Sequence, residues 1–96
     1  MSCALVIPQR LRHRIASFGL ADAALVEVYE RLRDLQNDPA ASLIQIRDSF
    51  EGMGHLVQFI DPDNRICVHT FLFQILYSQD EERLLVPRVV HSRRIG

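Results

Sequence analysis

The chain has 96 residues, enough for one domain with a single hydrophobic core and too few for two. Hydrophobic residues make up 48% and charged residues 24%, a composition typical of globular domains and unlike that of disordered or repetitive chains. Eleven cations against twelve anions give a formal net charge of -1, which excludes a uniformly basic, nucleic-acid-binding surface. The sequence therefore predicts one domain over residues 1–96 in which any phosphate-binding surface is local.

The apolar runs of the sequence are short. They fall far below the roughly 20 residues needed to cross a bilayer, and the N-terminus lacks the layout of a signal peptide. Cys3 and Cys67 each lie in an apolar, strand-like segment, as buried reduced thiols do, although a bridge between them stays open. We expect a cytoplasmic protein without a membrane partner.

The first part of the chain predicts one strand and two helices. An apolar run over 3–7 ends at Pro8, which suits the first turn of a helix running to Phe18, and Gly19 ends that helix. In the second helix Glu27 and Arg31 can pair at i,i+4. Its apolar residues recur at intervals of three and four: Leu25, Val28, Leu32 and Leu35. The short connection predicts an antiparallel helix hairpin.

After Pro39 the pattern becomes strand-like. A bend is expected over 51–54, a tight turn over 61–64 that begins with Asp61-Pro62, and an acidic turn over 78–83. Pro87 lies inside the last strand and predicts a bulge or a free edge. The predicted strands are Ser42–Arg47, His55–Ile60, Ile66–Tyr77 and Leu84–Val90.

The strand over 66–77 is predicted to be central, because both of its faces are largely apolar. His69 shares a face with Phe71 and Phe73, whereas Gln74 lies on the other face. The predicted fold class is α+β: an N-terminal strand, a two-helix hairpin, and a curled antiparallel sheet of three to four strands with the helices on one face.

The chain resembles the RelE/ParE toxin superfamily over nearly its whole length. The resemblance rests on the element order and on four short segments, with an ending closer to ParE-like members. These segments are Val6-Ile7-Pro8, Asp38-Pro39, Phe73-Gln74-Ile75-Leu76-Tyr77 and Arg88-Val89-Val90-His91-Ser92-Arg93-Arg94. The resemblance implies that the chain is the toxin of a type II toxin-antitoxin system, associated with plasmid stabilisation and neutralised by a cognate antitoxin.

Two activities divide that family. RelE-like members cleave mRNA on the ribosome without a metal, and ParE-like members inhibit DNA gyrase without being enzymes. Cleavage needs a proton acceptor and positive charge at the phosphate. The candidate catalytic residues are His91, Arg88, Arg93 and Tyr77. The candidate residues for phosphate, target or antitoxin binding are Arg47, Arg65, Arg88, Arg93 and Arg94.

Several features disfavour catalysis. The chain has no lysine, Gln74 stands where the family commonly has arginine, and the overall charge is slightly negative. Simpler explanations also exist. The polar ending can be a solvated tail, and Tyr77 can be a cross-strand aromatic residue. His69 can fill a pocket, since no Cys, Asp or second His stands at zinc-like spacing around it. No metal and no cofactor are predicted.

Three hypotheses follow from the sequence. A ParE-like toxin that binds DNA gyrase is favoured, a RelE-like ribonuclease acting on ribosome-bound mRNA is the alternative, and a non-toxic binding relative is the third. In each case the uncovered sheet face predicts a partner, namely the antitoxin or, without it, a second copy in a homodimer.

Overall fold

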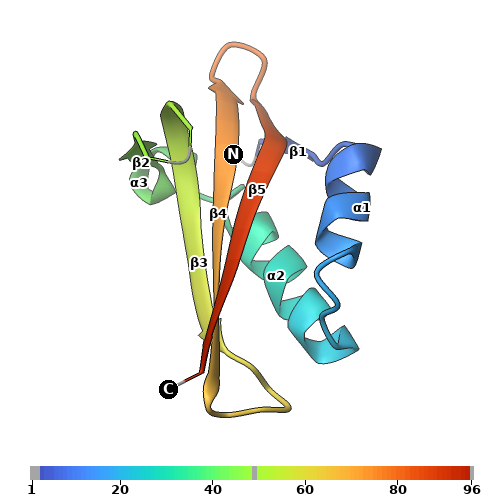
Figure 1. The fold of residues 1–96 in the computed structure, drawn as a ribbon. Coiled ribbons are helices and arrows are strands. Elements are labelled where there is room, and N and C mark those ends of the chain that lie inside the picture. The colour runs from blue at the N-terminus through green and yellow to red at the C-terminus, as the bar shows by residue number, and fades with distance from the viewer. Residues whose placement is uncertain (1–2, 49, 96) are drawn as a thin grey trace.

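The computed structural model describes residues 3–48 and 50–95 and has an α+β fold, as the sequence predicts (Figure 1). Both termini of the described chain lie in strands or next to one. The elements in chain order are β1 (Ala4–Val6), α1 (Gln9–Ala16), α2 (Asp22–Asp34), α3 (Pro39–Ser42), β2 (Ile44–Ile46), β3 (Gly52–Ile60), β4 (Cys67–Ser78) and β5 (Arg83–Ile95).

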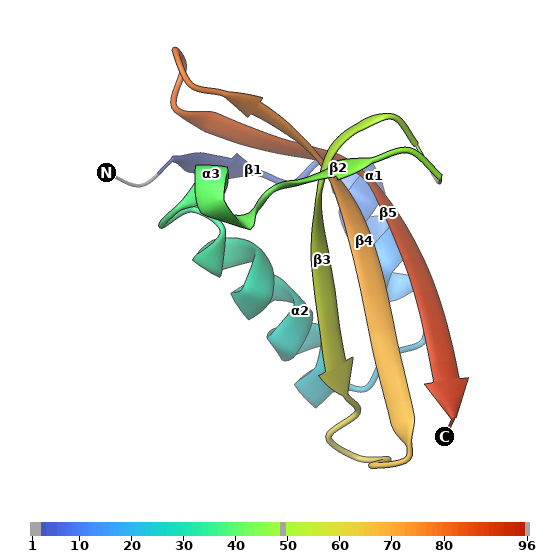
Figure 2. The ribbon, with the colours of Figure 1, turned by 90° about the vertical axis from the view of Figure 1, so that its left-hand side faces the viewer.

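The strands form one five-stranded sheet in the order β1-β5-β4-β3-β2 (Figure 2). The four strands from β2 to β5 are antiparallel neighbours, as predicted, and β4 is the central strand. β1 adds a fifth strand that runs parallel to β5, with Leu5 opposite Leu84. The sheet is therefore mixed, because the chain returns through both helices before it builds the antiparallel part.

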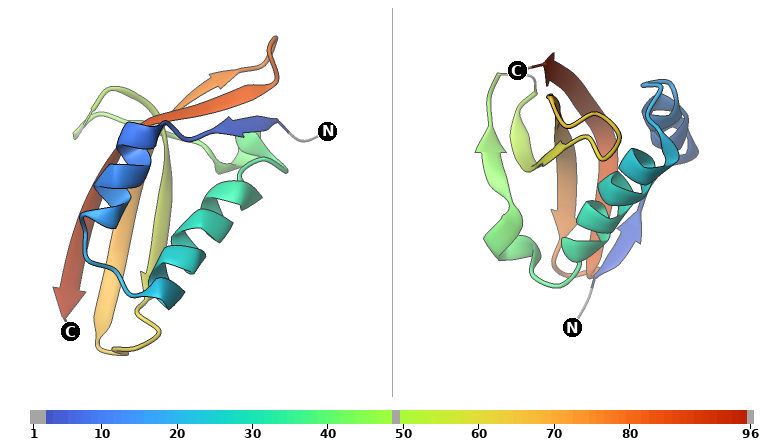
Figure 3. Two further views of the ribbon diagram at one scale, coloured as in Figure 1. Left: turned by 90° about the vertical axis from the view of Figure 1, so that its right-hand side faces the viewer. Right: turned by 90° about the horizontal axis from the view of Figure 1, so that it is seen from below.

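Helices α1 and α2 both cover the same face of this sheet (Figure 3). Their apolar sides supply Leu11, Ile15, Val28 and Leu32 to the core, each at most 3% exposed. On the outer side of α2, Arg31 Nε donates to Glu27 Oε1 at 2.8 Å, which confirms the predicted i,i+4 pair. The helices therefore leave one face of the sheet covered and the other open.

β4 buries every second residue along most of its length. The helix-facing side holds the buried residues, and the intervening residues Val68, Thr70, Leu72 and Gln74 are half-buried. The predicted face assignment of β4 is thus confirmed. The buried residues of β4 are Cys67, His69, Phe71, Phe73 and Ile75.

Pro87 lies at an irregularity in the sheet. The register between β4 and β5 shifts by one residue between Gln74 and Leu76, opposite the stretch of β5 that holds the proline. A proline has no N–H to donate to the ladder, so an extra residue at this point costs no regular hydrogen bond. The predicted bulge is confirmed.

Several predicted boundaries were wrong. The ending is not a solvated tail, because β5 pairs with β4 through Ile95. Residues Pro39–Ser42 form a helical turn, with Asp38 Oδ1 accepting from the N–H of Ala41 at 3.4 Å. β3 begins at Gly52, inside the predicted bend. Gly52 has a φ of 120°, which glycine can adopt because it has no Cβ.

Two further features concern the chain as a whole. Cys3 and Cys67 are both buried and free, so the structure contains no bridge between them. Within residues 3–48 and 50–95, no helix combines the length and the apolar character required to span a membrane.

Candidate functional site

The turn between β3 and β4 fixes the first side chain of the site. Asp61 Oδ1 accepts hydrogen bonds from the backbone N–H groups of Asp63 at 2.8 Å and Asn64 at 3.0 Å. This is the turn chemistry that the Asp61-Pro62 sequence predicted. Because Oδ1 is occupied by the turn, the carboxylate is held in one orientation with Oδ2 directed elsewhere.

That second oxygen lies 2.7 Å from Nε2 of His69, whose side chain is 0% exposed. A carboxylate can only accept, so the proton is on Nε2 and the ring orientation is fixed. The hydrogen bond from His69 is the main reason why the pKa of Asp61 lies below its ordinary value, with the N–H groups of Asp63 and Asn64 acting in the same direction. Asp61 is therefore ionised at neutral pH.

The other nitrogen of the buried ring continues the chain of contacts. His69 Nδ1 lies 3.0 Å from Nε2 of His91 on β5. The His91 ring stacks on Phe71 with centroids 4.5 Å apart and touches Phe18, which follows α1, at 4.8 Å. We call this hydrogen-bonded row the Asp61–His69–His91 chain.

Three causes lower the pKa of His91 below its ordinary value. Burial between the aromatic rings is the largest, followed by the charges of His69 and Arg93. His91 is consequently a neutral imidazole at pH 7, the form in which a histidine can accept a proton. Of the four predicted catalytic residues, His91 is the one that the structure connects to Asp61 and His69.

Cys67 completes the surroundings of His69. Its sulfur lies 4.0 Å from His69 Nε2, and the two side chains share a face because they are two positions apart in β4. The expectation that no Cys, Asp or second His surrounds His69 was wrong. Tertiary structure brings Asp61, Cys67 and His91 to it.

Two predicted arginines lie near this chain. Arg93 is directly opposite His69 on β5, on the same face as His91, and Arg65 lines an open surface hollow together with Asp61. Both arginines are exposed at their strand or turn positions. A third arginine, Arg14 of α1, lies over the Phe18 ring at 5.3 Å, and that ring contacts His91.

The other predicted residues lie elsewhere. Tyr77 pairs with Leu84, six positions along β4 from the residue opposite His91, a distance of about 20 Å in an extended strand. Partial desolvation of its hydroxyl end, with the Cys3 thiol as a further cause, raises the pKa of Tyr77 although the residue is 37% exposed. Tyr77 is thus not part of the His91 cluster.

Arg88, Arg94 and Arg47 are not gathered with His91 either. Arg88 and Arg94 are directly opposite Gln74 and Val68, so both lie on the open face of the sheet. Arg47 is an exposed residue just beyond β2. The predicted catalytic set is therefore divided between two faces and two ends of the sheet.

The open face is the second candidate surface. Its central row consists of Leu56, Leu72 and Val90, which are directly opposite one another on β3, β4 and β5. Leu56 is 50% exposed and Val90 is 42% exposed. Ile60, opposite Val68, extends the apolar surface at 60% exposure. We call these five residues the open-face patch.

One end of the open face is covered. Gln74 Nε2 donates to the backbone carbonyl of Glu51 at 3.4 Å, which places the segment between β2 and β3 across that end. Beside the patch, Gln58 Nε2 donates to Thr70 Oγ1 at 3.0 Å and separates the leucine row from Ile60. The patch itself is left to solvent or to a partner.

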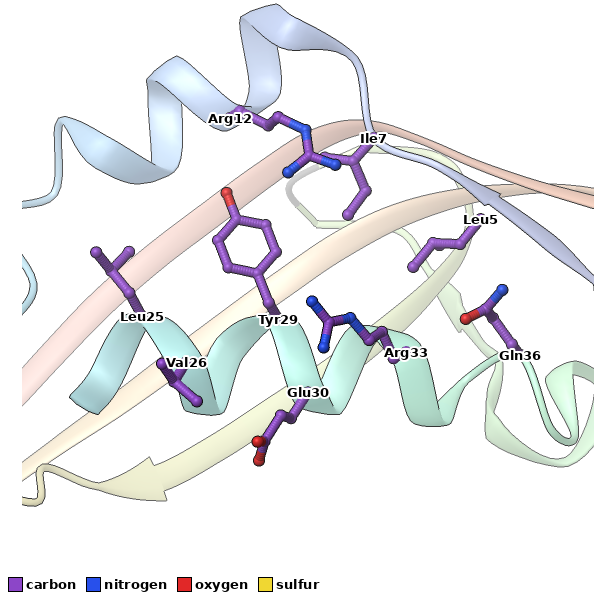
Figure 4. Close-up of a pocket in the computed structure, with 9 residues that line it drawn as sticks. All are labelled: Leu5, Ile7, Arg12, Leu25, Val26, Tyr29, Glu30, Arg33 and Gln36. Carbon is purple, nitrogen blue, oxygen red and sulfur yellow. The ribbon is translucent and has the colours of Figure 1, made fainter. Parts of the chain in front are cut away.

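A cavity of about 490 Å³ lies between β1, α1 and α2, and neither His69 nor His91 lines it (Figure 4). Its floor is apolar, and the guanidinium of Arg12 lies over the ring of Tyr29 at 5.6 Å. Arg33 also lines it. None of the sequence-predicted site residues is among its lining residues. Glu30 lines it as well, so the cavity is bordered by two arginines and one carboxylate.

No family model, no curated protein and no solved structure matches this chain.

Proposed function

We propose that the chain is a RelE/ParE-like toxin of a type II toxin-antitoxin system that acts in the cytoplasm by binding a protein, DNA gyrase, and not by catalysis. One observation carries the proposal: the open-face patch, in which Leu56, Val90 and Ile60 are exposed and Leu72 and Val68 are half-buried. The other face of the sheet is packed against both helices (Figure 3). Exposed apolar side chains gathered on one face of a sheet are typical of protein-binding sites.

The distribution of the predicted catalytic residues supports binding over catalysis. RNA cleavage requires the base, the phosphate-binding cation and the acid within hydrogen-bonding reach of one phosphate. Here His91 shares its face with Arg93 only, whereas Arg88 lies on the opposite face and Tyr77 at the other end of β4. The formal net charge of -1 gives no general attraction to RNA.

The antitoxin would cover the open-face patch in the toxin-antitoxin pair. An apolar helix or strand laid across Leu56, Leu72 and Val90 would bury them, while Arg88 and Arg94 at either end could pair with acidic side chains of the partner. Without the antitoxin, a second copy of the chain is the natural competitor for the same patch.

The test is to induce the chain alone in bacteria and to follow labelled thymidine and labelled methionine for several minutes. We expect thymidine incorporation to fall first. Leu56→Glu should abolish that fall, and His91→Ala should keep it. The matched control is Val26→Glu, which places the same charge on an equally exposed apolar residue of α2, away from the sheet. Continued incorporation of both labels with soluble protein present would refute toxicity.

A RelE-like ribonuclease is the second candidate, favoured by the Asp61–His69–His91 chain. A buried histidine fixed by a carboxylate and contacting a second histidine is an arrangement that can orient a general base. In that case methionine incorporation would fall first, and His91→Ala would abolish the effect while Leu56→Glu would not.

A further inference from the structure

The side chains around His69 have a composition that the toxin proposal does not use. Asp61, Cys67 and His69 each offer one ligand atom, and the three atoms lie within 4.8 Å of one another. Among residues 3–48 and 50–95 this is the one group of three or more such side chains. We propose that these three residues bind a zinc ion.

The separations suit a tetrahedral ion. With zinc bonded at its usual distances to nitrogen, oxygen and sulfur, neighbouring ligand atoms stand about 3.3–3.6 Å apart. The separation from His69 Nε2 is 2.7 Å to Asp61 Oδ2 and 4.0 Å to Cys67 Sγ, values on either side of that spacing. Shifts of about 0.5 Å in the Asp61 and Cys67 side chains would satisfy the geometry.

The donor types select the metal. A thiolate and an imidazole are the ligands that zinc prefers, and hard cations such as Mg²⁺ and Ca²⁺ are bound mainly by oxygen. On binding, Cys67 loses its proton because sulfur binds as thiolate. The His69 ring stays neutral: its proton moves from Nε2, which binds through its lone pair, to Nδ1, which then donates to His91 Nε2. The ion replaces the hydrogen bond between Asp61 and His69.

The groups that would hold these ligands in place are already present. His69 Nδ1, the nitrogen that does not face the ion, contacts His91 at 3.0 Å, and Asp61 Oδ1 is held by two backbone N–H groups. Outer contacts of this kind fix the orientation of metal ligands. Phe59 lies over the His69 ring at 5.5 Å and gives the site an apolar wall.

Asp61 also provides the route for the ion. Cys67 and His69 are buried, but the side chain of Asp61 is 15% exposed and borders the surface hollow that Ile60, Pro62 and Arg65 also line. With three protein ligands, the fourth position of the ion would be left to water. Zinc would tie the turn between β3 and β4 to the central strand.

The experiment measures metal uptake by the purified full chain after chelator treatment and dialysis. We expect one Zn²⁺ per chain by calorimetry and metal analysis, with a rise in Tm. Co²⁺ in its place should give the visible bands of a tetrahedral site and a thiolate-to-cobalt charge-transfer band. Cys67→Ala should remove the charge-transfer band, and Cys3→Ser, which alters the other buried cysteine, should leave it unchanged.

Two further variants keep the proposal falsifiable if Cys67→Ala fails to fold. Asp61→Asn preserves the turn, because Asn caps it as Asp does, and should weaken Zn²⁺ binding. His91→Gln should weaken binding about 10–100-fold as an outer contact. Failure of the folded chain to bind Zn²⁺, or a Co²⁺ spectrum without charge transfer, would overturn the proposal, as would equal affinity in Asp61→Asn. None of these outcomes depends on whether the chain is toxic.

Discussion

The two faces of β4 differ in what covers them. Phe71 and Phe73 point toward the helices and are 0% exposed, whereas Leu72, between them in sequence, points to the open face and is only half-buried. Neighbouring residues of one strand therefore contribute to different properties. The helix-facing side supplies most of the folding free energy, and the open side holds apolar surface that a partner can bury.

The largest effect is expected on the covered face. Phe71→Ala should lower the free energy of unfolding by about 3–5 kcal/mol, because the ring is fully buried and stacks on His91, Phe59 and Phe73. The matched variant Leu72→Ala should cost only about 1 kcal/mol. Urea denaturation of both variants measures the difference, and equal losses would show that the faces are equally packed.

Gly54 tests the covered end of the open face. A Cβ at this position would stand 2.7 Å from Ile46 Cγ1 and 2.9 Å from the carbonyl oxygen of Phe73. Gly54→Ala should therefore destabilise the chain by about 1–3 kcal/mol through overpacking. Gly19→Ala, where a Cβ meets nothing within 4 Å but φ is +70°, measures the conformational cost alone and should be smaller. The reverse order would contradict the packing of β2 on β3.

Asp61 links stability to pH at the edge of the covered face. The pKa of Asp61 in the folded protein is lowered, mainly by the hydrogen bond from His69. The contribution of Asp61 to the free energy of unfolding is therefore fully present above the ordinary pKa of 3.8, and it is lost as the pH falls through the lower pKa of the folded state. Asp61→Asn should flatten the fall in stability at acid pH. Metal-free protein followed by thermal unfolding from pH 6 to pH 2 tests this, with Asp63→Asn, on the exposed part of the turn, as the control.

The smallest effect on folding should come from the open-face patch. Leu56→Ser should change the free energy of unfolding by about 0.5 kcal/mol, similar to Val26→Ser on α2. If the patch binds a partner, Leu56→Ser should weaken self-association or antitoxin binding, and Val26→Ser should not. Sedimentation velocity at high concentration measures the self-association. A large loss of stability would show instead that Leu56 belongs to the core.

Much of the fold followed from local patterns in the sequence. The Asp61-Pro62 turn, the alternation along β4 and the bulge at Pro87 depend on backbone chemistry that neighbouring residues fix. The ending was harder to place, because polar residues over 91–94 have no apolar pattern. They form a strand since β4 offers a long ladder of hydrogen-bonding partners.

The candidate site was likewise predicted only in part from the sequence. His91 was identified from its residue type and its place in the ending, but its partners were not. A signal was available: Cys67 and His69 are two positions apart in a strand, and Asp61 stands at the start of the turn that leads into it. Alternation places the first two on one face, and only the closed hairpin brings Asp61 to them.

The sequence by itself determined the α+β class, the two helices, the central strand and the buried side of that strand, because these depend on the periodicity of neighbouring residues. Tertiary structure alone decided that β1 pairs with β5, that Tyr77 and Arg88 lie apart from His91, and that Asp61, Cys67 and His91 surround His69. These arrangements depend on strand register, and a shift of one residue would move each side chain to the opposite face.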